Sequence, residues 1–241
     1  MLTEQITKKP SQNCVICLKV GSLYSANYVN NLYYAIRKFT NDDFICFTDD
    51  PSGIDDGIIC YDMFPREHPN WRHLWCKIIM YGRDEIKKYN KKIFFDLDLV
   101  IQGDINPILN HECDWALIKS VWKGIKFRID NPKEPIFNSS VMVWKDNTWI
   151  YDLWEKSWER IVESYIGNDK WYWNENIKPT YLPNLFYSYR EGSKPEHYWE
   201  NNWQPYMKYQ PGFSVCLFHQ KPDIHELDPE EHLVKIWNGT L

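Results

Sequence analysis

The chain has 241 residues, 44% of them hydrophobic, and a formal net charge of −5 at pH 7. This length can bury a full core, and we expect a single domain over residues 13–241 behind a flexible N-terminus at 1–12. The negative charge argues against a nucleic-acid partner. No apolar run approaches the roughly 20 residues that cross a bilayer, and the polar N-terminus does not resemble a secretion signal. We therefore expect a cytoplasmic protein without a transmembrane segment.

The first predicted unit is a strand, a helix and a second strand. Residues 14–20 are apolar on both faces, as in a central parallel strand. Apolar side chains then recur at helical spacing over 28–39, and residues 44–47 predict the second strand. This order predicts a right-handed parallel βαβ unit. Ligands of open α/β sheets bind beyond the carboxyl ends of the strands, so the loop at 19–24 is a candidate nucleotide site. Its Tyr24 has two interpretations, stacking on a base or packing on the helix.

The segment on which the interpretation depends is 92–105, an apolar strand interrupted by Asp96 and Asp98. Strand side chains alternate between faces, so both carboxylates should point the same way while Leu97 points into the core. Two carboxylates at the tip of a buried strand repel each other and are costly to desolvate, unless a divalent cation neutralises them. The pair therefore favours a metal site.

Three interpretations of this acidic pair stay open. The first is a chance pair of exposed side chains at a strand end. The second is a phosphatase of the haloacid-dehalogenase type with Asp96 as nucleophile, although Leu and Val at 99–100 replace the usual Gly-Thr and the acidic pair at 49–50 lies upstream. The third is the Asp-x-Asp site of a nucleotide-sugar glycosyltransferase.

Further candidate residues precede and follow the acidic pair. Lys77 lies in a mostly apolar predicted helix that begins at Trp71, where it either reaches a phosphate or extends to solvent. Asn138 begins an apolar strand and offers both a donor and an acceptor. In the predicted loop at 121–135, Asp130 and Glu134 are exposed carboxylates.

The second half of the chain adds a helix, an aromatic region and a late histidine. Apolar side chains over 150–165 fit one helix face. The aromatic stretch that follows suits either a sugar-binding groove or core packing. His219 ends a predicted strand at 213–218, where it either completes a metal shell or is a core histidine. Residues 230–237 predict a short C-terminal helix.

In combination, five segments resemble the GT-A-fold glycosyltransferases. The resemblance is particularly to family 8, the glycogenin and lipopolysaccharide-sugar transferase group with its bacterial and viral relatives. The segments are residues 95–104, 138–143, 167–170, 188–190 and 218–222. The resemblance implies an α/β, Rossmann-like fold with a mixed, mostly parallel central sheet flanked by helices. It also implies a nucleotide-binding half at about 13–110 and an acceptor half at about 111–241.

The resemblance also implies a function and a set of site residues. It implies transfer of a sugar from a UDP-sugar to an acceptor hydroxyl on a glycan, with Mn²⁺ or Mg²⁺ held by Asp96, Asp98 and His219. The residues it implies for donor binding are Leu18, Val20, Gly21, Tyr24, Lys77, Leu97, Ser139 and Lys221. Those it implies beside the donor sugar, at the catalytic position, are Asp169, Lys77 and Asn138.

The chain departs from the family pattern at two places. Asn168-Asp169-Lys170 replaces the family's Gly-Asp-Gln, and the phosphate-binding lysine of the late segment falls at Asp223, which leaves Lys221 as its candidate substitute. The candidates for deprotonating an acceptor are Asp130, Glu134 and Asp169. The high aromatic content keeps one further alternative open, a catalytically inactive carbohydrate-binding relative.

Overall fold

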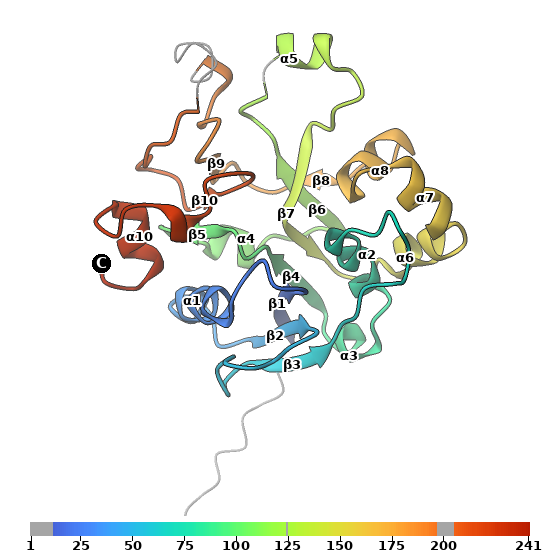
Figure 1. Ribbon diagram of the computed structural model, residues 1–241, viewed down its shortest axis with the longest axis horizontal. Coiled ribbons are helices and arrows are strands. Elements are labelled where there is room, and N and C mark those ends of the chain that lie inside the picture. Colours follow the sequence, from blue (N-terminus) through green and yellow to red (C-terminus); the bar gives the residue numbers. More distant parts are fainter. Residues whose placement is uncertain (1–11, 124, 197–204) are drawn as a thin grey trace, which may run out of the picture.

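A central sheet of seven strands organises the computed structural model, which describes residues 12–123, 125–196 and 205–241 (Figure 1). The N-terminal residues 1–11, which we expected to be flexible, lie outside the described residues. The strand order is β3-β2-β1-β4-β7-β6-β8. The strands are β1 (Asn13–Lys19), β2 (Asp43–Thr48), β3 (Ile59–Asp62), β4 (Lys91–Phe95), β6 (Trp115–Lys119), β7 (Phe137–Trp144) and β8 (Thr180–Tyr181).

The sheet is mixed and mostly parallel, as the resemblance to GT-A-fold glycosyltransferases implied. Strand β1 pairs in parallel with β2 and β4, and the pairs β2–β3 and β6–β8 are also parallel. Strand β7 runs antiparallel to both of its neighbours, β4 and β6. This reversal brings the beginning of β7 beside the end of β4.

Helices cover both faces of the sheet because its central strands are apolar on both sides. Val15 and Cys17 of β1 pack into one core cluster, whereas Cys14 and Ile16 pack into the other. Figure 1 shows α1 and α10 on one side and α2, α6, α7 and α8 on the other. The helices are α1 (Ala26–Arg37), α2 (Cys76–Tyr81), α3 (Asp84–Lys87), α4 (Asn106–Leu109), α5 (Ile125–Asp130), α6 (Thr148–Glu155), α7 (Trp158–Ser164), α8 (Asn168–Asn174) and α10 (His232–Trp237), with 3₁₀ turns η1 (His73–Trp75) and η2 (Ile224–Glu226). No helix in the described ranges is long and apolar enough to cross a membrane.

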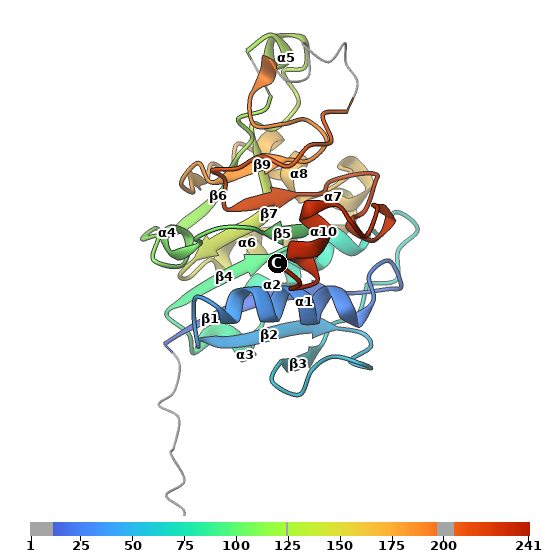
Figure 2. The same cartoon turned by 90° about the vertical axis from the view of Figure 1, so that its left-hand side faces the viewer.

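A second, three-stranded sheet lies over one face of the main sheet, next to α1 and α10 (Figure 2). It consists of β5 (Leu99–Ile101), β10 (Val215–Leu217) and β9 (Phe186–Ser188), in that order. Strand β10 is antiparallel to β5 and parallel to β9. The three strands of this small sheet come from distant parts of the chain.

The single strand expected over 92–105 is therefore two strands in two sheets. Strand β4 ends at Phe95 in the main sheet, and β5 begins at Leu99 in the small one. The backbone between them is tied to both sheets, since the Asp96 N–H donates to the Ser140 carbonyl and the Phe218 N–H donates to the Asp98 carbonyl, each at 2.8 Å. The acidic pair thus lies at the junction of the two sheets.

Two other expectations about secondary structure were wrong. The helix predicted over 150–165 is interrupted, because Ser157 takes the N-cap position of α7 and its carbonyl accepts the Ile161 N–H at 3.0 Å. The loop predicted over 121–135 contains α5, which projects from the body of the molecule (Figure 2).

Candidate functional site

A cleft of about 420 Å³ opens where β1 and β4 end. This is the edge at which ligands of α/β sheets bind. The predicted site residues that line it are Leu18, Val20, Tyr24, Lys77, Asp96 and Asp98. The structure thus brings together the predicted nucleotide loop, the acidic pair and the lysine from α2.

The acidic pair has one buried cation beside it. The Lys77 ammonium lies 2.7 Å from Asp96 Oδ2 and 5.3 Å from the centre of the Phe94 ring. Lys77 is only 9% exposed, because its helix packs against the main sheet. One positive charge therefore faces two carboxylates, so the group carries excess negative charge.

Burial and this excess charge both act on the protonation of Asp98 and of Asp169, which adjoins the cleft. Burial, together with the neighbouring charge of Asp96, raises the pKa of the Asp98 carboxyl to about 7, and Lys77 opposes that rise. Burial also raises the pKa of the Asp169 carboxyl, again against the influence of Lys77. A carboxyl that titrates near neutrality is poised either to bind a cation or to exchange a proton.

The wall of the cleft that we predict to hold the nucleotide is built around Gly21. Its N–H donates to Asp49 Oδ2 at 2.8 Å, and its φ of +76° is a left-handed conformation that suits glycine. The His73 ring lies where a side chain at Gly21 would be, since a Cβ added there would be 2.3 Å from His73 Cε1. Tyr24 packs on Tyr28 with ring centres 4.8 Å apart. The loop is therefore held closely between β2 and η1.

A polar cluster from β7 and α8 adjoins the acidic pair. The Ser139 N–H donates to Asp169 Oδ2 at 3.3 Å, and Asn168 Nδ2 donates to Ser139 Oγ at 2.9 Å. Asn138 accepts the Ser140 N–H through Oδ1 at 2.8 Å. Because the Ser140 carbonyl also accepts the Asp96 N–H, these residues lie directly beside the end of β4.

His219 lies in a different setting from the acidic pair. Its Nε2 is 3.0 Å from Ser188 Oγ and 3.7 Å from Glu191 Oε2, and its ring stacks on Trp122. Its Nδ1 is buried and has no hydrogen-bond partner among the described residues. His219 does not line the cleft.

Asp96, Asp98 and His219 are not gathered as the ligands of one ion. Within the described ranges, the group of metal-type side chains whose ligand atoms all lie within 4.8 Å of one another is Asp223, His225 and Glu226. Asp96 and Asp98 nevertheless fit a divalent cation, because their oxygens are hard ligands and their charge is not balanced. The assignment of His219 to the metal stays a prediction.

The remaining predicted residues have partners of their own. The Lys221 ammonium lies 2.6 Å from Asp223 Oδ2 and 2.7 Å from Glu226 Oε1. Glu134 pairs with Lys170 of α8. Leu97 is 3% exposed and packs in the core, as the strand pattern predicted. The predicted contact between Leu97 and a nucleotide-sugar donor would therefore be made by the main chain of Leu97.

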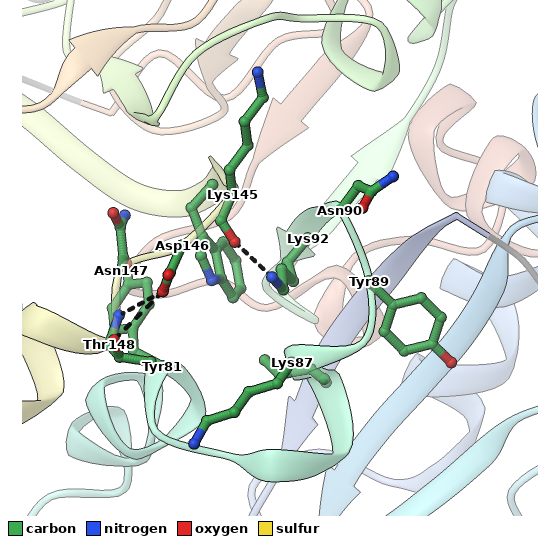
Figure 3. A pocket seen from close by; sticks show the side chains of 11 residues that line it. Tyr81, Lys87, Tyr89, Asn90, Lys92, Lys145, Asp146, Asn147 and Thr148 are labelled. Carbon is green, nitrogen blue, oxygen red and sulfur yellow. Dashed lines mark hydrogen bonds between the residues drawn. The ribbon is translucent and has the colours of Figure 1, made fainter.

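A second cavity, of about 490 Å³, lies at the opposite end of β4 (Figure 3). It is lined by Lys87, Lys92 and Lys145, and the Lys92 ammonium donates to the Lys145 carbonyl at 2.5 Å. Its carboxylate, Asp146, accepts the Thr148 N–H at 3.4 Å. This cavity has no acidic pair among the residues that line it, so its chemistry differs from that of the cleft.

Leu23, from the predicted nucleotide loop, also lines the cleft. The structure adds three cleft residues that sequence reasoning missed, namely Arg72, His73 and Leu74. They come from the segment at η1, just before Lys77. Their only signal in the sequence was that proximity to Lys77, because which of them reach the cleft depends on how η1 folds against Gly21.

Comparison with known proteins identifies the fold. No protein-family model matches the sequence, and no curated protein matches it. Among solved structures, the galactosyltransferase LgtC in complex with donor and acceptor sugar analogs matches with a TM-score of 0.59 at 10% identity, over 94% of this chain and 96% of LgtC. The glycosyltransferase GlyE of Streptococcus pneumoniae TIGR4 matches with a TM-score of 0.63 at 12% identity, over 96% of this chain and 60% of GlyE. The bifunctional glycosyltransferase WbbM matches with a TM-score of 0.56 at 11% identity, over 90% of this chain and 47% of WbbM.

Proposed function

We propose that this chain is a metal-dependent glycosyltransferase of the family 8 type. It would move a sugar from a nucleotide-sugar donor, a UDP-sugar, to an acceptor hydroxyl on a glycan. The observation that carries the proposal is the cleft in which Asp96 and Asp98 lie beside Lys77 at the carboxyl ends of the strands. The fold shared with LgtC, GlyE and WbbM supports it.

Each predicted residue has a role in this proposal. Asp96 and Asp98, with His219 as the third predicted ligand, would hold Mn²⁺ or Mg²⁺. A divalent cation supplies Lewis acidity that stabilises negative charge on the departing diphosphate. Val20, Gly21 and the other residues of the loop before α1 would hold the uridine, with Tyr24 against the base.

The chemistry breaks one bond and forms another at the same carbon. The bond between the sugar's anomeric carbon and the diphosphate oxygen breaks, and its electron pair leaves with the nucleoside diphosphate. The acceptor oxygen bonds to that carbon and gives up its proton to a base. Asp169, whose pKa burial raises, is suited to a role beside the sugar, together with Asn138 and Ser139. Lys77 would stabilise the charge that develops on the leaving group.

Thermal unfolding with UDP and Mn²⁺ tests the proposal. A ligand that binds only the folded state raises the melting temperature, so UDP with Mn²⁺ should raise it and UDP alone should raise it less. Asp98→Ala and His219→Ala should remove the shift while the protein stays folded. If Asp98→Ala binds UDP with Mn²⁺ as tightly as the wild type, the site assignment is wrong.

A screen of nucleotide-sugar donors separates this proposal from its two alternatives. A transferase with Mn²⁺ should release UDP slowly from the correct donor even without an acceptor. A phosphatase should instead form a phosphoenzyme on Asp96 and hydrolyse generic phosphate esters. A carbohydrate-binding relative should bind glycans but release no nucleotide from any donor.

A further inference from the structure

Beyond the divalent ion, close contact with a diphosphate in the cleft requires a cationic side chain that is free to meet it. A nucleoside diphosphate brings negative charge next to Asp96 and Asp98, and charges of the same sign repel unless cations intervene. Lys77 already pairs with Asp96, at 2.7 Å. Lys221 already pairs with Asp223 and Glu226, and that trio carries a net charge of −1. Neither lysine is available without breaking an ion pair.

Arg72 meets the requirement. Its side chain lines the cleft together with Lys77, Asp96 and Asp98, and it is exposed. Across the described part of the chain, its guanidinium has no carboxylate partner and no hydrogen bond, in contrast to the two lysines.

The backbone of Arg72 is fixed although its side chain is free. Arg72 is the N-cap residue of η1, and its carbonyl accepts the Trp75 N–H at 2.9 Å. Trp75 is fully buried and anchors this turn in the core. The side chain of Arg72 therefore starts from a fixed backbone position at the cleft. Its planar set of donors matches the paired oxygens of a phosphate, which a lysine ammonium meets only as a point charge.

We propose that Arg72 binds the diphosphate of the donor and gives the cleft its preference for nucleoside diphosphates over nucleosides. This inference rests on the proposed function, since it assumes that the cleft receives a nucleotide. It extends that function by assigning phosphate contact to the N-cap residue of η1 and not to the late segment around Lys221.

The test compares UDP with uridine, each in the presence of Mn²⁺, by calorimetry and by ligand-observed NMR on the full chain. Replacing Arg72 by methionine keeps a long side chain but removes the charge and the donors. Arg72→Met should weaken UDP binding about 10- to 100-fold, as expected for losing a charge-assisted bidentate contact. It should leave uridine binding unchanged, and Arg72→Lys should recover part of the loss.

Arg160→Met is the matched control, because Arg160 is an exposed arginine of α7 that does not line the cleft. It should bind both ligands as the wild type does. The assignment of Arg72 is overturned if Arg72→Met binds UDP as tightly as the wild type, or if it loses uridine and UDP equally. If the wild type itself binds no UDP, the proposed function fails and this inference fails with it. The two failures are therefore distinguishable.

Discussion

Lys77 Nζ lies 2.7 Å from Asp96 Oδ2, and both side chains are largely buried, at 11% and 19% exposed. The pair joins α2 to the junction between β4 and β5. It is the direct link between the helix that precedes the acidic pair and the pair itself. Because Asp98 lies beside Asp96, the lysine offsets part of the charge of two carboxylates at once.

Replacing Lys77 by methionine should destabilise the protein in the absence of divalent cations. Removing one partner of a buried ion pair leaves the other uncompensated, and we expect a loss of about 1–3 kcal/mol in the free energy of unfolding, because this pair keeps some contact with solvent. Urea denaturation at pH 7.5 measures it. Lys156→Met, at an exposed position without an ion pair in the described chain, is the control and should change little.

Mn²⁺ should restore part of the stability that Lys77→Met loses. If a cation binds between Asp96 and Asp98, it replaces the missing positive charge, so the variant should gain more stability from Mn²⁺ than the wild type gains. An equal gain in both proteins would contradict the metal site at this pair.

Asp98 should make the stability of the metal-free protein fall as pH rises. Its pKa is raised from 3.8 to about 7 in the folded state, so between these values the folded protein binds more protons than the unfolded chain. The free energy of unfolding therefore falls over this window, and the loss is complete above about pH 7. Asp98→Asn removes the titrating group.

Urea denaturation of wild type and Asp98→Asn between pH 4 and pH 8 isolates this effect. Because other groups titrate as well, the relevant quantity is the difference between the two proteins. Asp98→Asn should become the more stable by about 1–3 kcal/mol at neutral pH, whereas the wild type should alone gain stability from Mn²⁺ with UDP. A difference that does not change with pH would show that Asp98 is ionised normally.

Asp169→Asn should lower the rate of sugar transfer and leave UDP binding intact. Asp169 adjoins Ser139 on the side of the cleft predicted for the sugar, and not the loop predicted for the nucleotide. Loss of a group that acts on the reacting atoms typically costs about 10²–10⁴-fold in rate. Single-turnover kinetics and UDP calorimetry measure the two quantities. Asp152→Asn, an exposed aspartate of α6, is the control. A parallel loss of UDP affinity would instead indicate damage to the cleft.

The central part of the fold could be predicted because its signals are local. Residues of β1 are apolar on both faces, α1 has apolar side chains at helical spacing, and the two together specify a parallel unit. The acidic pair could also be recognised from the sequence, because charged side chains inside an apolar run are costly to bury unless something neutralises them. These signals depend on neighbours in sequence, which a single chain displays directly.

The small sheet and the η1 side of the cleft could not be predicted in the same way. The pairing of β5 with β10 joins Leu99 to Leu217, and nothing near either residue specifies the other. That pairing ends β4 early and sets where His219 lies. Likewise Arg72 and His73 reach the cleft because η1 folds back against Gly21, a contact between segments that lie far apart along the chain.

The contact between Gly21 and His73 makes it possible to measure the effect of backbone strain separately from the effect of a change in cleft shape. Gly21 and Gly212 both have left-handed φ values, +76° and +86°. A Cβ at Gly21 would meet the His73 ring, whereas a Cβ at Gly212 would have nothing within 4 Å. Alanine at either position should therefore carry a similar backbone cost of about 1 kcal/mol. His73 is exposed and can turn away, so the added stability loss at Gly21 should be small.

Gly21→Ala should weaken UDP binding, and Gly212→Ala should not. Turning His73 away from Gly21 moves a wall of the cleft, because His73 lines it, while Gly212 lies outside the cleft. Urea denaturation should give similar losses for the two variants, and calorimetry with UDP and Mn²⁺ should separate them. In a His73→Ala background the clash is absent, so adding Gly21→Ala should then change UDP affinity little. If Gly21→Ala weakens UDP binding equally in both backgrounds, the effect comes from the backbone of the loop and not from His73.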